Sequence, residues 1–314
     1  MIHKTFSRSN ISKGFSLVEL MISIALGLLV VGATLSIFST NKQAYRTTEN
    51  LGRVQEGARI GFELIGNDVR ESGGTQCSRG IDVVSILTPS APMASGDFWS
   101  DWNNTVRGID NTGPNGSDTL QLKSGSADMF HVNGHDSTAA TIDINSTQNH
   151  NLVAGDIAII CDYREGAIFQ VTNVAGDAIS HSAGGLNTIS NLGINGANYN
   201  FADHATLSRV NATEWFVAAN GRGGNSLFRN TLRNASMGAP EEIAEGVNNM
   251  QITYLLDDGA DYVTSAFVVP LARWDDVIAV RIAIVFESQD AIGTGGARLQ
   301  RPAIQTFNLR NRTP

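Results

Sequence analysis

The chain has few of the residues and motifs on which redox or catalytic chemistry usually depends. Its 314 residues include only two cysteines, Cys77 and Cys161, and these do not form a Cys-x-x-Cys pair, so neither a redox motif nor a zinc knuckle is indicated. No Gly-x-Ser-x-Gly elbow is present, and we expect no strand before the glycine-rich stretch 221–224, which also lacks a following Lys-Ser or Lys-Thr. We therefore expect a protein that is not an enzyme and that needs no cofactor.

Charge is missing from two stretches near the N-terminus. Residues 1–14 contain no acid but three cations, Lys4, Arg8 and Lys13, which is typical of a targeting segment that stays on the cytoplasmic side. Residues 20–41 carry no charge at all, and as a helix they would span roughly 33 Å, enough to cross a bilayer core. Because no Ala-x-Ala arrangement follows this run, we expect the helix to remain in the mature protein.

One acid, Glu19, lies at the start of this apolar segment. Gly14, Phe15 and Glu19 together resemble the class III signal of type IV prepilins and of type II secretion pseudopilins. The resemblance implies cleavage between Gly14 and Phe15 by a prepilin peptidase, followed by N-methylation of the new terminal Phe15. It also implies that Glu19 pairs with the terminal amine of a neighbouring subunit during assembly.

The energetics of Glu19 agree with such a partner. A carboxylate in hydrocarbon costs about 2.5 to 3.5 kcal/mol on the insertion scale. Two opposite charges about 4 Å apart attract by roughly 4 kcal/mol at an effective dielectric near 20, so a neighbouring amine would offset that cost. The alternative is a plain single-span anchor in which Glu19 reaches the membrane interface.

A helical pattern continues after the apolar segment. Apolar residues recur at spacings of three and four: Leu51, Val54, Ala58, Phe62, Ile65 and Val69. This stripe predicts an amphipathic helix that Gly73-Gly74 would end, while the glycines within it (Gly52, Gly57, Gly61 and Gly66) predict a bend or local loosening and argue against a coiled-coil seam.

The period of the sequence changes from about 3.6 to 2 after Gly74. Alternating segments predict strands at Asp118–Lys123, Ile142–Ile144, Asp156–Ile160 and Ala167–Val174. Asn133-Gly134 and Asp258-Gly259 predict turns, Asp276–Glu287 a long central strand, and Ala303–Arg310 a last strand. The expected fold class is α+β and pilin-like, with a long N-terminal helix packed on a mainly antiparallel head with long loops.

Several downstream segments resemble the PilW family of minor pilins. They are residues 70–77, 155–162, 168–172, 245–254, 277–288 and 309–312. The resemblance implies four parts: a leader at 1–14, a transmembrane and assembly helix at 15–41, its amphipathic continuation at 42–72, and a periplasmic β-rich head at 73–314. The chain places Cys161 before Asp162, the reverse of the order in the family.

Export of the head affects two expectations: the oxidation state of the two cysteines and the net charge of the mature chain. Cys77 and Cys161 are expected to form a disulfide, which closes a loop of about 84 residues and contributes roughly 4 kcal/mol in the loop-entropy model. Removal of the leader leaves 19 basic and 30 acidic residues, a net charge of about −11. Nucleic acid is therefore not an expected partner.

Three other groups of residues are weak candidates for binding sites. His131 and His135, beside Asp128 and Asp136, would suit a metal on a helix but are separated by the predicted turn. Asp257, Asp258 and Asp261 could hold calcium but lack the EF-hand spacing, so a solvated turn is the simpler interpretation. Trp99 and Trp102 could form a binding patch or part of a loop that covers the head.

The resemblances together predict a structural minor pilin that helps to initiate or cap a type IV pilus and supports twitching motility. Its expected partners are other minor and major pilins, the prepilin peptidase and the inner-membrane assembly platform. The chain would cross the inner membrane once with a periplasmic head, and would later lie at the pilus tip. The alternatives are a J-type pseudopilin of type II secretion and, less favoured, an anchored periplasmic enzyme.

Overall fold

The computed structural model describes residues 14, 16–74, 81–88, 98–100, 102, 104–145, 150–201 and 204–311. The chain divides into two compact units, Met1–Leu51 and Gly52–Pro314, which we call the N-terminal unit and the globular unit. Phe15 and Cys77 lie outside the described residues. The predicted cleavage and disulfide, which depend on them, therefore stay predictions.

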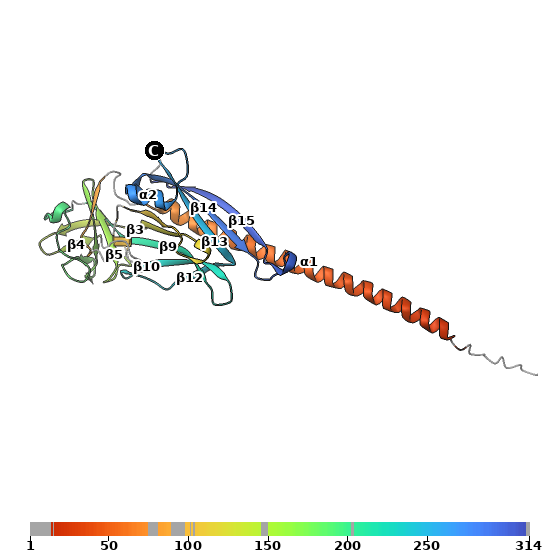
Figure 1. Cartoon of the computed structure of the whole chain (residues 1–314). Coiled ribbons are helices and arrows are strands. Elements are labelled where there is room, and N and C mark those ends of the chain that lie inside the picture. Colours follow the sequence, from red (N-terminus) through yellow and green to blue (C-terminus); the bar gives the residue numbers. More distant parts are fainter. Residues whose placement is uncertain are drawn as a thin grey trace, which may run out of the picture. The chain divides into compact units, whose positions relative to one another are not determined.

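Helix α1, Leu17–Glu71, is continuous over 55 residues and contributes to both units (Figure 1). After Glu71, the N–H of Ser72 still donates to the Asp68 carbonyl at 3.0 Å, and Gly73 then adopts a φ of 71°. This left-handed conformation is a common helix cap that favours glycine. The predicted stop at Gly73-Gly74 is thus confirmed.

The described strands of the globular unit form two sheets. The main path of the 12-stranded sheet is β1-β6-β5-β9-β3-β4-β8-β7, with β2 paired to β3 and β10 paired to β9, β11 and β12. The 3-stranded sheet has the order β13-β14-β15. Among the described pairs β1 and β6 are parallel, and the others are antiparallel. The expected α+β class with a mainly antiparallel sheet is confirmed.

The bounds of these elements are as follows. The larger sheet contains β1 (Asp82–Ser85), β2 (Val106–Ile109), β3 (Thr119–Asp136), β4 (Thr141–Ile144), β5 (Ile157–Cys161), β6 (Glu165–Gln170), β7 (Asn173–Ala175), β8 (Ala178–Ser180), β9 (Thr206–Ala219), β10 (Asn225–Arg233), β11 (Ser236–Met237) and β12 (Glu241–Glu245). The smaller sheet contains β13 (Val247–Leu256), β14 (Val277–Glu287) and β15 (Gln300–Asn308), and a short helix α2 (Ser265–Leu271) lies between β13 and β14 in the chain.

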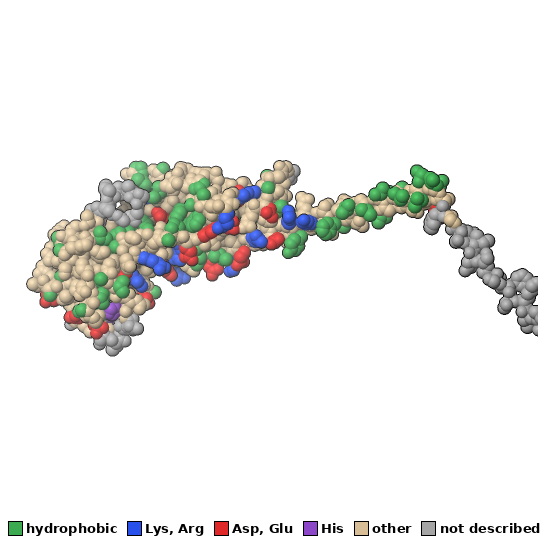
Figure 2. Space-filling model, turned by 90° about the horizontal axis from the view of Figure 1, so that it is seen from below, with side chains coloured by type: hydrophobic (Ala, Val, Ile, Leu, Met, Phe, Trp, Pro, Cys, Tyr) green, Lys and Arg blue, Asp and Glu red, His purple; other side chains and the backbone are tan. Residues whose placement is uncertain are grey.

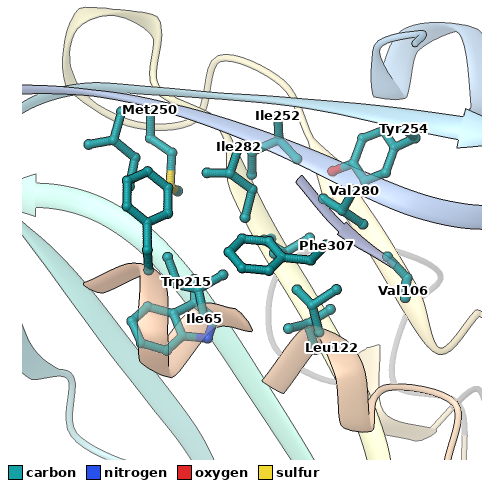
Figure 3. Packing of buried hydrophobic residues seen from close by; sticks show 14 of the residues in the cluster. Ile65, Val106, Leu122, Trp215, Met250, Ile252, Tyr254, Val280, Ile282 and Phe307 are labelled. Carbon is teal, nitrogen blue, oxygen red and sulfur yellow. The ribbon is translucent and has the colours of Figure 1, made fainter. Parts of the chain in front are cut away.

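The largest apolar core joins α1 to both sheets. Phe62, Ile65 and Val69 of the predicted stripe are buried in it, and Val54 and Ala58 pack against it in part. The inner face of the smaller sheet lies opposite the helix, together with residues of β2, β3, β9 and β10 (Figure 3). The stripe from residue 54 onward therefore faces the core as its spacing predicts.

Two of the glycines of α1 allow close packing. A Cβ placed on Gly66 would lie 2.5 Å from Cε1 of Phe307, and one on Gly61 would lie 3.2 Å from Cδ2 of Leu227. A Cβ on Gly57 would meet Ala244 at an ordinary 3.5 Å. The helix continues through all three positions, and two of the glycines let β10 and β15 side chains approach it closely. The predicted bend or local loosening stays a prediction.

Of two predictions about β3, one is confirmed and one is wrong. The strand predicted at Asp118–Lys123 forms the start of β3 from Thr119 onward. All six residues are buried, because α1 and the smaller sheet cover one face and the segment around Phe98 lies against the other. Asn133-Gly134 was expected to form a turn, but it lies inside β3 at a shift of register against β4. Asn133 is the extra residue at this bulge, and Gly134 pairs with Asp143.

Candidate assembly site

Ser16 immediately precedes α1 and caps its first turn. Its Oγ accepts a hydrogen bond from the Glu19 N–H at 3.2 Å, which satisfies one of the unpaired donors at the start of a helix. Glu19 lies in that first turn, where the helix dipole favours an acid by about 0.3 to 1 kcal/mol. Among the described residues, none forms a hydrogen bond or ion pair with the Glu19 carboxylate.

The capping role of Ser16 is not marked by the prepilin pattern. Ser16 and Glu19 have the Ser-x-x-Glu spacing of a capping box, so the signal was present in the sequence. Glu19 therefore contributes to the start of the helix, in addition to the assembly role predicted for its charge. A substitution of Glu19 therefore affects both the stability of the helix start and the charge available for assembly.

Between Leu17 and Phe38, helix α1 exposes apolar side chains all around its axis. Exposed apolar residues are Leu17, Val18, Leu20, Met21, Ile22, Ile24, Leu26, Leu28, Leu29, Val30, Val31, Leu35, Ile37 and Phe38 (Figure 2). The mean hydropathy of the most apolar window is 2.4, and the helix is long and apolar enough to cross a membrane by length and composition. A helix that is apolar all round requires a lipid or protein environment.

Four hydroxyl groups on this apolar segment form local hydrogen bonds. Ser23, Thr34, Ser39 and Thr40 each donate to a backbone carbonyl three or four residues earlier, at 2.7 to 2.9 Å. Such bonds remove unpaired donors from the helix surface, which hydrocarbon would otherwise penalise. The surface is thus chemically suited to a bilayer or to packing against like helices.

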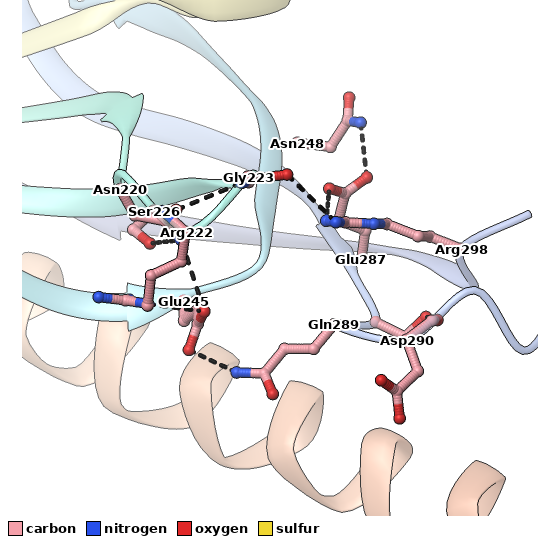
Figure 4. Close-up of polar contacts among 12 residues, drawn as sticks. Asn220, Arg222, Gly223, Ser226, Glu245, Asn248, Glu287, Gln289, Asp290 and Arg298 are labelled. Carbon is pink, nitrogen blue, oxygen red and sulfur yellow. Dashed lines mark hydrogen bonds and ion pairs between the residues drawn. The ribbon is translucent and has the colours of Figure 1, made fainter.

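In the globular unit, α1 carries a charged face. Arg59 lies 2.9 Å from Glu56 and 3.4 Å from Glu63, and all three side chains are largely exposed, so these pairs contribute little to stability. Arg53 donates to Gln289 at 2.7 Å, and Gln289 in turn donates to Glu245 (Figure 4). This chain of bonds holds α1 to the ends of β12 and β14.

Comparison with known families decides what kind of protein carries this helix. A model of the prokaryotic N-terminal methylation motif matches residues 9–35, and a model of type IV pilus-assembly protein W (PilW) matches residues 214–311. The first match contains Gly14, Phe15 and Glu19, and the second extends from β9 through β15. The two matches support a type IV pilin-like protein with a prepilin methylation motif at its start and a PilW region at residues 214–311. The predicted matches at 70–77 and 155–172 lie outside both models.

The other comparisons add little to this family assignment. A type IV-like pilin from Thermus thermophilus is similar over 83% of this chain and 98% of its own, at 10% sequence identity and a TM-score of 0.30. A likeness of that degree carries no argument. No curated protein matches the chain.

Within the region that matches PilW, the glycine-rich stretch 221–224 connects β9 to β10. A strand therefore does precede it, contrary to expectation. Asn220 Oδ1 accepts the N–H of Arg222 at 2.9 Å and that of Gly224 at 3.2 Å, which closes the turn. Arg222 extends from the turn to Glu245 at 3.2 Å (Figure 4). The stretch is a hairpin connection whose arginine binds carboxylates of the same unit.

Two carboxylates of the predicted acidic turn bind an arginine. Arg273 lies 2.8 Å from Asp258 and 3.4 Å from Asp257, and it also pairs with Asp276. The hydrogen bond from Arg273 lowers the pKa of Asp258. Arg273 supplies a positive charge where calcium would otherwise be needed, which disfavours the calcium hypothesis; Asp261 is exposed and outside this cluster.

The predicted histidine and aspartate group does not assemble. The part of the chain that the structure describes contains no cluster of three or more His, Cys, Asp or Glu side chains able to hold a metal. His135 instead contacts a residue that local sequence could not suggest: its Nε2 lies 2.9 Å from Nε2 of His181. Asp136 accepts the backbone N–H groups of Thr138 and Ala139 at 2.9 and 3.0 Å and so forms the turn after β3.

The remaining candidates, Trp99 and Cys161, are buried. Trp99 is only 2% exposed in an apolar cluster with Ile159 and Ile168, and Trp102 packs partly against that cluster. The hypothesis of an exposed aromatic binding patch is therefore wrong for Trp99. Cys161 ends β5 and is 3% exposed, and its pairing with Cys77 stays a prediction.

Proposed function

We propose that this chain is a minor pilin that is cleaved between Gly14 and Phe15, N-methylated on Phe15 and assembled into a type IV pilus, where it helps to initiate or cap the filament. A prepilin peptidase would act on it in the inner membrane, with the globular unit on the periplasmic side. The assembly platform and other minor and major pilins would be its partners. No nucleic acid or cofactor is required by this role.

The carboxylate of Glu19 carries the proposal. The helix dipole returns at most about 1 kcal/mol of stabilisation at this position, whereas inserting the acid costs about 2.5 to 3.5 kcal/mol. An uncompensated cost of roughly 2 kcal/mol remains in the isolated subunit. A terminal amine on a neighbouring subunit, created by cleavage before Phe15, would offset it.

The test replaces Glu19 in a strain that lacks the wild-type gene. We expect Glu19→Ala and Glu19→Gln chains to be processed to an N-terminus at Phe15 but to be reduced at least tenfold in sheared pili. Glu63→Gln is the matched control, because Glu63 is an exposed acid on the same helix. Mass spectrometry of the mature N-terminus and immunoblots of the pilus fraction give the two measurements. Full incorporation of Glu19→Ala would disprove the pairing role.

A deletion strain distinguishes a pilus from a secretion filament. Loss of surface pili and twitching with intact secretion of exoproteins supports the proposal. Loss of exoprotein secretion with normal pili would instead assign the chain to a type II secretion system as a J-type pseudopilin. The family match to type IV pilus-assembly protein W favours the first outcome.

A further inference from the structure

A polar cavity of about 190 Å³ lies in the globular unit beside the last turn of α1. Side chains of β3, β9 and β10 line it together with Asp68 and Glu71 of the helix. Ligand pockets for drug-sized molecules usually measure about 300 to 1,000 Å³. This cavity therefore suits a single small molecule or one ring of a larger one.

The cavity is lined by hydrogen-bonding groups that the chain itself leaves unused. Ser124 and Thr213 are only 8% and 7% exposed, and with Asn211 and Thr231 they line the cavity. No described residue hydrogen-bonds any of these four side chains. Asn211 is exposed and Thr231 is half-buried, whereas Ser124 and Thr213 are buried. Buried polar side chains normally have a partner, so the hydroxyls of Ser124 and Thr213 at this cavity indicate a polar ligand.

The charges of the cavity indicate that this ligand is neutral. Asp68 accepts a hydrogen bond from the Trp215 indole at 2.8 Å and lies 3.0 Å from a guanidinium nitrogen of Arg229. Burial raises the pKa of Asp68, while Arg229 and Trp215 oppose this. Arg229 is thus matched by Asp68. The other two charged residues of the lining are Glu71 and Lys123, whose ammonium donates to the Phe98 carbonyl at 2.7 Å. Acids and cations are equal in number, so the cavity has no net charge to attract an ion, which favours a neutral ligand.

We infer that this cavity binds one neutral hexose ring of a glycan. Sugar hydroxyls both donate and accept hydrogen bonds, which suits hydroxyl and amide side chains. Leu122 and Leu232 supply an apolar wall for the C–H groups of such a ring. This site is independent of Glu19 and of the assembly role, so either proposal can fail alone.

The test uses the full chain in lipid nanodiscs, because maltoside detergents carry glucose. Glucose, galactose and mannose are offered singly, and saturation-transfer NMR and titration report binding. We expect at least one of them to bind. Glucuronate, which differs from glucose by one carboxylate, should bind several-fold more weakly than glucose, because its charge would lose hydration in a cavity that offers no net positive charge.

Side-chain variants locate the binding. Thr213→Val and Ser124→Ala each remove one hydroxyl, and together they should weaken binding about tenfold or more. Thr306→Val is the control, because Thr306 is an exposed threonine on β15. Thermal unfolding checks that each variant is folded; should Thr213→Val not fold, Ser124→Ala alone decides. No binding of any neutral hexose, tighter binding of glucuronate, or binding unchanged by the hydroxyl variants would each overturn the inference.

Discussion

At the residue scale, the contact between His135 and His181 sets a requirement on protonation. The two Nε2 atoms are 2.9 Å apart, and His135 Nδ1 accepts the N–H of Phe201 at 3.1 Å. Nε2 of His135 must therefore carry the proton, and it donates a hydrogen bond to Nε2 of a neutral His181. Burial lowers the pKa of both rings from 6.5 to about 4.

These lowered pKa values predict a loss of stability in acid. Between pH 6.5 and 4 the unfolded chain binds protons that the folded chain does not, so the free energy of unfolding is greatest above pH 6.5 and falls as the pH approaches 4. We expect the melting temperature to drop more steeply over this range in the wild type than in a His135→Gln/His181→Gln variant. Thermal unfolding across the pH range measures this.

His131 supplies the control for that experiment. It is an exposed histidine on the same strand, so His131→Gln should keep the wild-type pH profile. If the double variant and the wild type instead lose stability in parallel from pH 6.5 to 4, the histidine pair does not titrate as the structure implies.

Residue-level reasoning from sequence succeeds where partners are close along the chain. Gly14 and Glu19 were identifiable because a processing motif has fixed local spacing, and Ser16 could have been identified in the same way. His135 and His181 are 46 residues apart, and Asp68 and Arg229 are 161 apart. Neither pairing has a local signal, because the sheet topology alone brings the partners together.

At the element scale, two glycines of α1 should respond oppositely to the same substitution. Gly66→Ala places a Cβ 2.5 Å from Cε1 of Phe307, whose ring is 7% exposed, and overpacking of this kind costs about 1 to 3 kcal/mol. Gly57→Ala meets Ala244 at 3.5 Å and should stabilise the helix by up to about 1 kcal/mol. Denaturant unfolding midpoints of the two variants measure both shifts.

Phe307→Leu tests whether the ring causes the cost. In a double-mutant cycle, Gly66→Ala should cost less in the Phe307→Leu background, because a smaller side chain leaves room for the new Cβ. Equal costs in both backgrounds, or a stabilising Gly66→Ala, would show that the helix does not approach β15 as closely as the structure has it.

Helices and strands could be predicted from the sequence where one face is buried and the other is exposed to solvent. The stripe of α1 and the strand β14 follow from their periodicity, because each has a core face. The strand at Asp118–Lys123 was also predicted, although its polar residues Gln121 and Lys123 are buried. Gln121 donates to Glu214 at 2.8 Å, and Lys123 donates to the Phe98 carbonyl at 2.7 Å. Alternation of polarity therefore did not report exposure in a strand covered on both faces.

At the scale of the whole molecule, the predicted Cys77–Cys161 disulfide would connect the segment after α1 to β5. In the loop-entropy model this cross-link contributes roughly 4 kcal/mol. We expect the oxidised protein to lose stability of about that size on reduction. Guanidinium unfolding with and without reductant measures the difference, and thiol labelling of the native oxidised protein should find no reactive cysteine.

Cysteine variants separate the cross-link from the packing of the buried Cys161 side chain. Either single substitution breaks a disulfide completely, so Cys77→Ala, Cys161→Ala and the double variant should lose similar stability, apart from a cavity cost at Cys161, which is 3% exposed. Two unlinked thiols would instead give additive losses, with almost none at Cys77→Ala if that thiol makes no buried contact. Non-additive losses therefore indicate the disulfide itself. Once one cysteine is replaced the cross-link is already lost, so the second substitution adds only its own packing cost.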